Sequence, residues 1–164
     1  CIETRLIDLT PVRAAELEAL KDITEMTDHS AANIAPRLRM TTLYSVAGSE
    51  NRLVAGTGNR SEAFVGYFTK WGDGAYDFNP ISDLTVTEIY EFLRYLNAPA
   101  SIIEKAPSAG LYEGQTDEQE MGVSYADIDA VILGKEVSSP EAEAEILRRH
   151  NASLHKLNPA KTFA

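Results

Sequence analysis

A short apolar segment that leads directly into a glycine-containing turn restricts the fold of this chain more than any other feature. Residues 52–57 read Arg-Leu-Val-Ala-Gly-Thr, and residues 58–62 read Gly-Asn-Arg-Ser-Glu before a helical pattern begins. An apolar run of this length is typical of a strand buried on both faces of a parallel sheet. Because strand patterns alternate with more numerous helical patterns, the sequence predicts an α/β fold, a parallel sheet flanked by helices.

Proline and serine residues mark where several helices should begin. Pro11 and Pro140 stand at favoured first helical positions, and Ser124 precedes an apolar run with Asp127 three residues later, a capping-box variant. The helices predicted from these signals and from hydrophobic spacing cover residues 11–27, 33–47, 85–96, 124–133 and 140–151. The alternation in residues 2–9 predicts a further strand. Residues 106–122 contain proline and several glycines and predict a loop.

The composition is that of a soluble globular protein with one domain over residues 1–164. The chain has 25 acidic and 15 basic residues, a formal net charge of −10, which argues against a nucleic-acid partner. No apolar run approaches the about 20 residues of a membrane span. The single cysteine excludes an internal disulfide and favours a reducing cytoplasm. Because Cys1 stands where a complete cytoplasmic product would have methionine, we expect an N-terminal part to be missing.

Several common catalytic patterns are absent. The three histidines, His29, His150 and His155, form no i, i+4 pair, so a zinc site receives no support. No Gly-x-Ser-x-Gly element is present that would indicate a serine hydrolase. The sequence Gly-Thr-Gly at residues 56–58 begins like a dinucleotide-binding fingerprint, but Ser61 stands where its third glycine belongs.

Polar residues after the predicted 52–57 strand are the candidates for a site. Thr57 ends that strand, and the carboxyl ends of strands are where open α/β folds bind ligands. Glu62 falls in the first turn of the next helix, where a carboxylate can also simply complement the helix dipole. Lys70, Asp73 and Asp77 follow in a glycine-rich loop and can equally be solvated loop charges.

Longer blocks of the chain resemble the NAD synthetase family, the ammonia-dependent type. The segment Asn-Ile-Ala-Pro-Arg-Leu-Arg-Met-Thr-Thr-Leu-Tyr at residues 33–44 resembles the helix motif of that family, and residues 56–62 with residues 66–74 resemble its central signature. Further blocks follow in the same order at residues 80–84, 107–118 and 155–156. The resemblance covers essentially the whole chain.

This resemblance implies an adenine-nucleotide α-hydrolase-like fold, a homodimer and a two-step amide synthesis. The nicotinate carboxylate of deamido-NAD would attack the α-phosphorus of ATP and release pyrophosphate, and ammonia would then displace AMP from the acyl-adenylate to give NAD. A carboxylate must approach a polyanion in the first step, so Mg²⁺ and cationic side chains are needed to neutralise both. Water must be kept from the mixed anhydride.

The resemblance also assigns roles to individual residues. It implies that Thr57 and Ser108 contact ATP and that Glu62 ligates Mg²⁺ through its carboxylate oxygens. The residues implied to hold deamido-NAD are Arg37, Lys70, Asp77, His155 and Lys156. These assignments place the few basic side chains of an acidic chain where anionic substrates bind.

Two departures from the family pattern stand out. The Ser-Gly-Gly-x-Asp-Ser loop that cradles pyrophosphate is absent, and the nearest candidate, residues 108–110, lacks its pattern; the chain is therefore expected to begin after this loop and to be inactive alone. Val86 stands where many relatives have an ATP-contacting lysine, and the start of its helix could offer free N–H groups instead, or Val86 could pack in the core. A related ATP pyrophosphatase and a non-catalytic nucleotide-binding or dimerisation module remain as alternatives.

Overall fold

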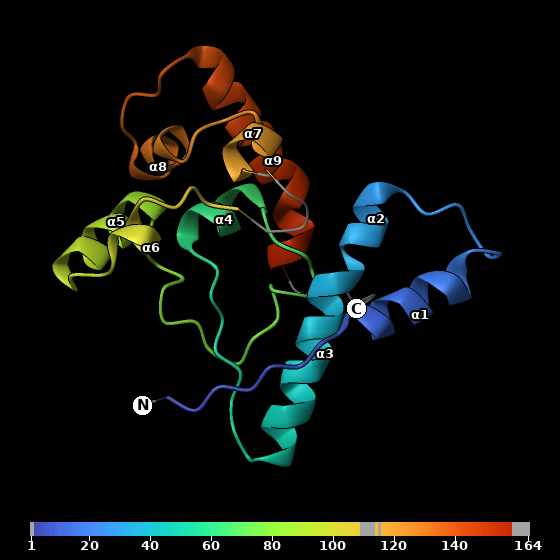
Figure 1. Ribbon diagram of the computed structural model, residues 1–164. Helices are drawn as coiled ribbons and strands as arrows, with labels where there is room; N and C mark the ends of the chain where they lie inside the picture. Colours follow the sequence, from blue (N-terminus) through green and yellow to red (C-terminus); the bar gives the residue numbers. More distant parts are fainter. Residues whose placement is uncertain (1, 109–113, 115, 159–164) are drawn as a thin grey trace, which may run out of the picture. The chain divides into compact units, whose positions relative to one another are not determined.

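The computed structural model describes residues 2–108, 114 and 116–158 (Figure 1). The chain divides into two compact units, which are treated separately below. Unit 1 comprises residues 1–56 and 69–78, and unit 2 comprises residues 57–68 and 79–164. Cys1 and residues 109–113 lie outside the described part, so the expectations that fall on them stay predictions. The assignment of one domain to residues 1–164 also stays a prediction.

Unit 1 is built on three helices. They are α1 (Thr10–Leu20), α2 (Asp28–Ala32) and α3 (Ile34–Ser49), and both α1 and α2 pack against α3. The predicted helix at 11–27 is confirmed only to residue 20, because residues 21–27 include three threonine or isoleucine residues, which are stiff at χ1 and lower helix propensity. The helix predicted at 33–47 is confirmed and extends slightly further.

The β-structure of unit 1 is a single parallel bridge between Ala55 and Phe78. Gly56 N–H donates to the Phe78 carbonyl at 2.7 Å, and Asp77 N–H donates to the Val54 carbonyl at 2.9 Å. Among the described residues no longer ladder forms, so the predicted parallel sheet is not present there. Val54 is buried but Leu53 is 71% exposed, so the expectation of a strand buried on both faces is wrong for this segment.

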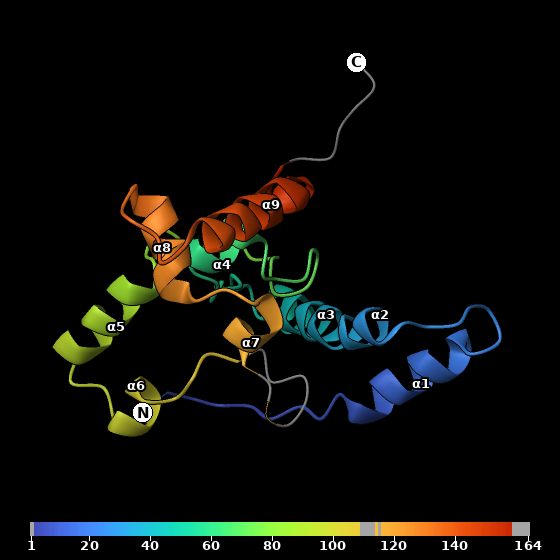
Figure 2. The same cartoon turned by 90° about the horizontal axis from the view of Figure 1, so that it is seen from above.

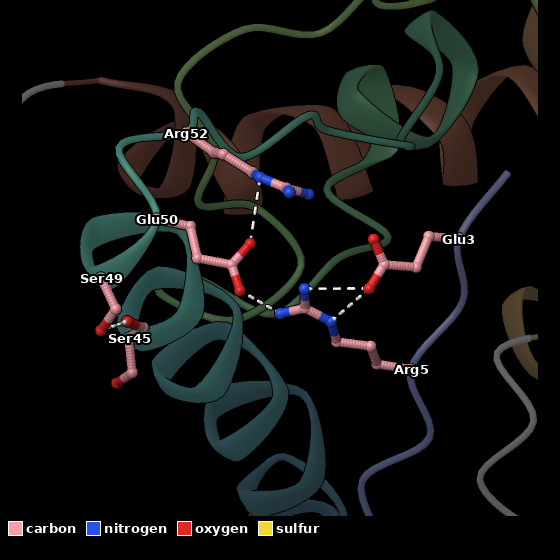
Figure 3. Close-up of polar contacts among 6 residues, drawn as sticks. All are labelled: Glu3, Arg5, Ser45, Ser49, Glu50 and Arg52. Atoms are coloured by element: carbon pink, nitrogen blue, oxygen red, sulfur yellow. Dashed lines mark hydrogen bonds and ion pairs between the residues drawn. The ribbon is translucent and has the colours of Figure 1, made fainter.

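Residues 2–9 lie outside any helix or strand, so the strand predicted there is wrong. Alternating side chains favour a strand only where a neighbouring strand accepts the backbone hydrogen bonds. The segment is held by side chains instead: Arg5 pairs with Glu3 at 3.0 Å and with Glu50 at the end of α3 (Figure 3). Arg52 Nε lies 3.0 Å from the second carboxylate oxygen of Glu50. Hydrogen bonding from Arg5 lowers the pKa of Glu50.

Unit 2 contains the remaining described helices. They are α4 (Arg60–Val65), α5 (Val86–Tyr95), α6 (Ala100–Ile103), α7 (Asp117–Met121), α8 (Tyr125–Leu133) and α9 (Pro140–Leu157). Helix α4 packs against α8 and α9, and α8 also contacts α5 and α9 (Figures 1 and 2). The Ser124 cap is confirmed by its hydrogen bond from Asp127 N–H, and α9 continues six residues beyond its predicted end.

Helix α7 corrects the prediction of a loop over residues 106–122. The Thr116 side chain caps α7 by accepting from Gln119 N–H, and Gly122 ends it in the left-handed conformation. Five residues are too short for hydrophobic periodicity to reveal a helix. The nearby α6 is shorter still and carries no side-chain cap, so the sequence did not indicate it either.

The apolar core of unit 2 lies between these helices. It is formed by buried side chains, namely Val65, Val86, Met121, Val123, Tyr125, Ile128 and Ile146. Ile128 of α8 and Ile146 of α9 are fully buried. This core fixes α4, and with it the residues that follow Thr57. None of the helices in the described part of the chain combines the length and apolar composition needed to cross a bilayer.

Candidate functional site

The start of α4 holds Glu62 in a defined orientation. The Asn59 side chain accepts from Glu62 N–H at 2.9 Å, and the Glu62 carboxylate accepts from Asn59 N–H at 2.8 Å. This reciprocal pair is a capping box, which satisfies two backbone donors at the helix N-terminus. The structure therefore confirms the helix-terminal role considered for Glu62. Thr57, two residues before Asn59, is exposed.

A small hollow lies beside this capping box within unit 2. Its volume is about 140 Å³. Its polar lining comes from Asn59 and Glu62, and the rest comes from α5, α6 and neighbouring segments: Val86, Ile89, Tyr90, Leu93, Ile102, Pro107 and Tyr125. One carboxylate therefore lines a mostly apolar concavity that is smaller than the pockets that enclose drug-sized ligands.

Tyr125 closes one side of this hollow as a neutral hydrogen-bond donor. It is 3% exposed, and its hydroxyl donates to Asp117 Oδ2 at 3.0 Å. Burial, followed by the negative charges of Glu62 and Asp117, raises the pKa of Tyr125 far above its ordinary value. Tyr125 thus keeps its proton at every physiological pH.

The carboxylates of the described residues fit Mg²⁺ only as part of a larger ligand set. No group of three or more histidine, cysteine, aspartate or glutamate side chains in that part of the chain is arranged to hold a metal ion. Mg²⁺ is commonly held by one or two carboxylates while substrate phosphates and waters complete its shell. Glu62, whose carboxylate lines the hollow, meets that requirement for one ligand.

Ser108 follows Pro107, a residue that lines the same hollow. The Pro107 carbonyl accepts from Asp117 N–H at 3.1 Å, which ties this segment to the start of α7. Ser108 is exposed and lies at the edge of the described residues. Thr57, Glu62 and Ser108 therefore all belong to unit 2.

In unit 1 the structure brings three of the predicted dinucleotide-binding residues onto α3 and the loop that faces it. Arg37 Nε donates to the Lys70 carbonyl at 3.4 Å. Asp77 Oδ2 accepts from Val54 N–H at 2.7 Å, and Tyr44 of α3 donates its hydroxyl to Asp77 Oδ1 at 3.4 Å. Arg37 and Asp77 are thus each tied to unit 1, Arg37 through the Lys70 carbonyl and Asp77 through Tyr44 and Val54.

Tyr44 contacts Asp77, a contact that the sequence did not indicate. Burial, with help from the Asp77 charge, raises its pKa, so it stays a hydroxyl donor. A usable signal was present: Tyr44 lies seven residues after Arg37, two helical turns along the same face of α3.

His155 and Lys156 lie in the last turn of α9, in unit 2. Lys156 Nζ donates to the carbonyls of Gly66 and Phe68 at 2.7 and 2.8 Å, and it lies 5.2 Å from the centre of the Phe68 ring. Gly66 is the left-handed residue that ends α4, so Lys156 satisfies backbone acceptors near this helix end. His155 is exposed.

The start of α5 corrects the expectation that this helix offers free N–H groups to ATP. Val86 N–H donates to Ser61 Oγ at 3.0 Å, and Thr87 N–H donates to Asp129 Oδ2 at 2.8 Å. The Glu88 N–H donates to Thr85 Oγ1. Val86 itself is 8% exposed and belongs to the apolar core, which favours the packing role.

A buried polar network joins α4, α5 and α8. Asp129 is 3% exposed and accepts from the Ser61 hydroxyl and from both the backbone and the hydroxyl of Thr87. No local pattern in the sequence indicated it, because Ser61 and Asp129 are 68 residues apart. The network fixes the residue that directly precedes Glu62.

Comparisons with known proteins agree on one family. A family model described as NAD synthase matches residues 1–162. The chain is 53% identical over 153 residues to the NH(3)-dependent NAD(+) synthetase of Carboxydothermus hydrogenoformans, covering 92% of this chain and 63% of that protein. It is 44% identical to the Pyrococcus furiosus protein of the same name, covering 93% of this chain and 58% of that protein. The chain thus spans less than two thirds of the length of these relatives.

Solved structures of similar proteins give the same result. A structure of NMN synthetase from Francisella tularensis matches with a TM-score of 0.93 and 44% identity, covering 98% of this chain and 66% of that one. The NH3-dependent NAD synthetase of Campylobacter jejuni, in complex with the nitrate ion, matches with a TM-score of 0.75 and 29% identity, covering 96% and 64%. Together with the contacts described above, these matches show that the chain belongs to the NAD synthase family.

Proposed function

We propose that this chain is the larger part of an enzyme that converts deamido-NAD, ATP and ammonia into NAD, AMP and pyrophosphate. The observation that carries the proposal is the 53% identity to an ammonia-dependent NAD synthetase, sustained over 92% of the chain. The capping box at Glu62 and the contact between Arg37 and the Lys70 carbonyl support it, because both lie in blocks that resemble the family signature.

The proposed chemistry is the formation of one amide bond in two steps. A carboxylate oxygen of the nicotinate group attacks the α-phosphorus of ATP, and the bond to pyrophosphate breaks. Ammonia then attacks the acyl carbon, and AMP departs with the transferred oxygen while the nitrogen loses a proton. ATP is a co-substrate in this reaction, and Mg²⁺ bound near its phosphates would supply charge neutralisation.

We assign ATP and Mg²⁺ to unit 2. Glu62 would give Mg²⁺ a single carboxylate ligand, and Thr57 and Ser108 would offer hydroxyl groups to ATP. The exposure of the Glu62 carboxylate to the hollow supports this assignment, because a carboxylate there can give Mg²⁺ one oxygen ligand. The neutral Tyr125 hydroxyl adds no charge to the hollow.

We assign deamido-NAD to Arg37, Lys70, Asp77, His155 and Lys156. Arginine and lysine can neutralise the diphosphate. Asp77 is oriented by Val54 N–H and Tyr44, so one of its roles is to hold the loop next to α3. If Lys70 binds the dinucleotide, Lys70→Ala raises the KM for deamido-NAD by about 10- to 150-fold and the KM for ATP by less.

The remaining expectations from the family resemblance are also proposals. We propose that the complete protein is a cytoplasmic homodimer with the α/β adenine-nucleotide α-hydrolase-like fold. The parallel bridge between Ala55 and Phe78 supports the sheet, because it has the strand direction that this fold requires. Size-exclusion chromatography with light scattering tests the dimer.

A second candidate is the amidation of nicotinate mononucleotide. It is favoured by the TM-score of 0.93 and 44% identity to the NMN synthetase of Francisella tularensis. The acyl group and the nucleophile would be the same, and the substrate would lack the adenylate half of deamido-NAD. A non-catalytic nucleotide-binding module is the third possibility, and the same assay addresses it.

The test compares the two acyl donors in one assay. Chain 1–164 is assayed alone and as a fusion in which it replaces the matching 63% of the Carboxydothermus hydrogenoformans relative. We expect the fusion to have a kcat/KM for deamido-NAD at least tenfold above that for nicotinate mononucleotide. The reverse preference would establish the second candidate, and a folded fusion that binds ATP but amidates neither donor would support the non-catalytic module.

A further inference from the structure

Trp71 combines two features that are unfavourable for a tryptophan. Its φ angle is +62°, in the left-handed region that a bulky side chain rarely adopts. Its side chain is also 63% exposed, although the indole is among the most favourable groups to bury. Unfavourable backbone conformations of this kind persist where the surrounding structure enforces them, and they cluster at ligand-binding sites.

The surrounding turn does enforce this conformation. The Thr69 carbonyl accepts from the N–H groups of both Gly72 and Gly74, and Thr69 N–H donates to Asp73 Oδ1 at 3.0 Å. A side chain at Gly72 would come within 3.0–3.1 Å of Thr69 and Pro36, so the turn packs tightly on the start of α3. The indole is therefore presented by a rigid turn of unit 1.

One cationic side chain lies over the exposed ring. Lys70 Nζ is 5.4 Å from the centre of the Trp71 ring. Arg37 holds the same turn through the Lys70 carbonyl, at 3.4 Å. An aromatic face next to positive charge suits a planar ring that is joined to phosphate through a sugar, because the ring stacks while the cation meets the anion.

We propose that Trp71 is a stacking platform for a heteroaromatic ring of the nucleotide substrate, with Lys70 beside it for the attached negative charge. The proposal rests on the proposed function, because deamido-NAD carries two such rings, nicotinate and adenine, joined through phosphates. Either ring has the required chemistry. The experiment therefore separates the two with nucleotides that contain only one of them.

The chain contains a single tryptophan, so intrinsic fluorescence reports on this position alone. Chain 1–164 is titrated separately with deamido-NAD, with nicotinate mononucleotide and with AMP, and N-acetyltryptophanamide corrects for absorption by the nucleotide. We expect saturable quenching by deamido-NAD and by whichever mononucleotide carries the stacked ring. Quenching is expected to weaken in 1 M salt, because salt screens the attraction between the phosphates and cationic side chains.

Variants separate stacking from a structural role. Trp71→Asn is expected to weaken deamido-NAD binding, measured by calorimetry, about 5- to 100-fold. Trp71→Phe keeps an aromatic face and should weaken it much less. The matched control is Tyr95→Ala, since Tyr95 is also an exposed aromatic residue, 79% exposed, and should leave binding unchanged.

The Tm of Trp71→Asn distinguishes a stacking role of Trp71 from a packing role, because the two roles predict changes of opposite sign. Asparagine tolerates the left-handed conformation, so Trp71→Asn should raise the Tm of the free protein by about 1–4 °C while weakening nucleotide binding. A fall in Tm with unchanged affinity would show that Trp71 is a packing residue and would overturn the proposal.

The outcomes also distinguish this proposal from the proposed function. If the protein forms NAD but no nucleotide quenches Trp71, the stacking role is wrong and the activity stands. If nicotinate mononucleotide or AMP quenches Trp71 saturably while no acyl donor is amidated, the stacking role stands and the activity is wrong. Emission that depends on protein concentration and not on nucleotide would mean that a second copy of the chain covers the ring, which overturns the proposal.

Discussion

Replacing Asp129 by alanine should destabilise unit 2 more than any other single loss of a polar side chain among the described residues. Asp129 accepts a hydrogen bond from the Ser61 hydroxyl. It also accepts from the Thr87 N–H at 2.8 Å and from the Thr87 hydroxyl at 2.6 Å. Ser61 is fully buried and Asp129 is 3% exposed, whereas Thr87 is exposed. After the substitution, water can reach the Thr87 donors but not the Ser61 hydroxyl.

The magnitude follows from these differences in burial. Leaving the buried Ser61 hydroxyl without an acceptor costs about 1–3 kcal/mol. Removing the negative charge from the N-terminus of α5 costs about 0.5–2 kcal/mol more. Relief of the desolvation of a buried carboxylate offsets part of this, so we expect a net loss of about 2–4 kcal/mol. That is a large fraction of the about 5–15 kcal/mol that stabilises a typical domain.

The assay is equilibrium unfolding in urea followed by far-ultraviolet circular dichroism. Asp129→Asn keeps an acceptor for Thr87 N–H, so it should lose only about 1–2 kcal/mol. Asp22→Ala, at an exposed position after α1, serves as the matched control and should change the free energy of unfolding by less than about 0.5 kcal/mol. If Asp129→Ala lost less than about 1 kcal/mol, the network would not hold α4 and α5 together as described.

Three further predictions concern single side chains. Glu62→Gln can keep the capping box with Asn59, so the free energy of unfolding in urea should change by less than about 0.5 kcal/mol. NAD formation should fall at least about tenfold because the negative charge is lost, and equal NAD formation by wild type and variant would refute the metal role. Val86→Lys places a charge in the core and should lower the unfolding free energy by about 1–3 kcal/mol; an unchanged Tm would show an open site instead. Hydrogen bonds from Arg148 and, to a smaller extent, from Arg149 lower the pKa of Glu145 from 4.5 to about 2. The stabilisation from the ionised Glu145 is present above pH 4.5 and is lost toward pH 2, so the free energy of unfolding of wild type should fall more than that of Glu145→Gln over this interval. Urea titrations of both proteins at each pH check this, and an equal fall in the two proteins would contradict it.

Local signals in the sequence were sufficient for the helices with strong caps. Ser124 and Pro140 located the starts of α8 and α9, because capping and proline geometry depend only on residues a few positions away. The capping box at Glu62 also depends on a local residue, Asn59, although the only helix-terminal role considered there from the sequence was with the helix dipole. These contacts are local, so a single sequence contains what is needed to predict them.

Contacts between distant segments were beyond local reasoning. The alternation in residues 2–9 predicted a strand, but strand formation depends on a partner, and side-chain pairs from Arg5 hold the segment instead. The N–H groups at the start of α5 were considered as donors to ATP, but in the structure they donate to Ser61 and Asp129. The family resemblance pointed to the blocks around Glu62 and Lys70, yet it gave no indication of the exposed Trp71 held at positive φ.

Activation of the nicotinate carboxylate by transfer of an adenylyl group can be followed with an isotope label. Deamido-NAD labelled with ¹⁸O in its carboxylate is incubated with ATP, ammonia and the fusion protein, and the products are analysed by mass spectrometry. We expect AMP that carries one ¹⁸O and NAD amide that retains the other. Label in inorganic phosphate with formation of ADP, or NAD formed with unlabelled AMP, would contradict it.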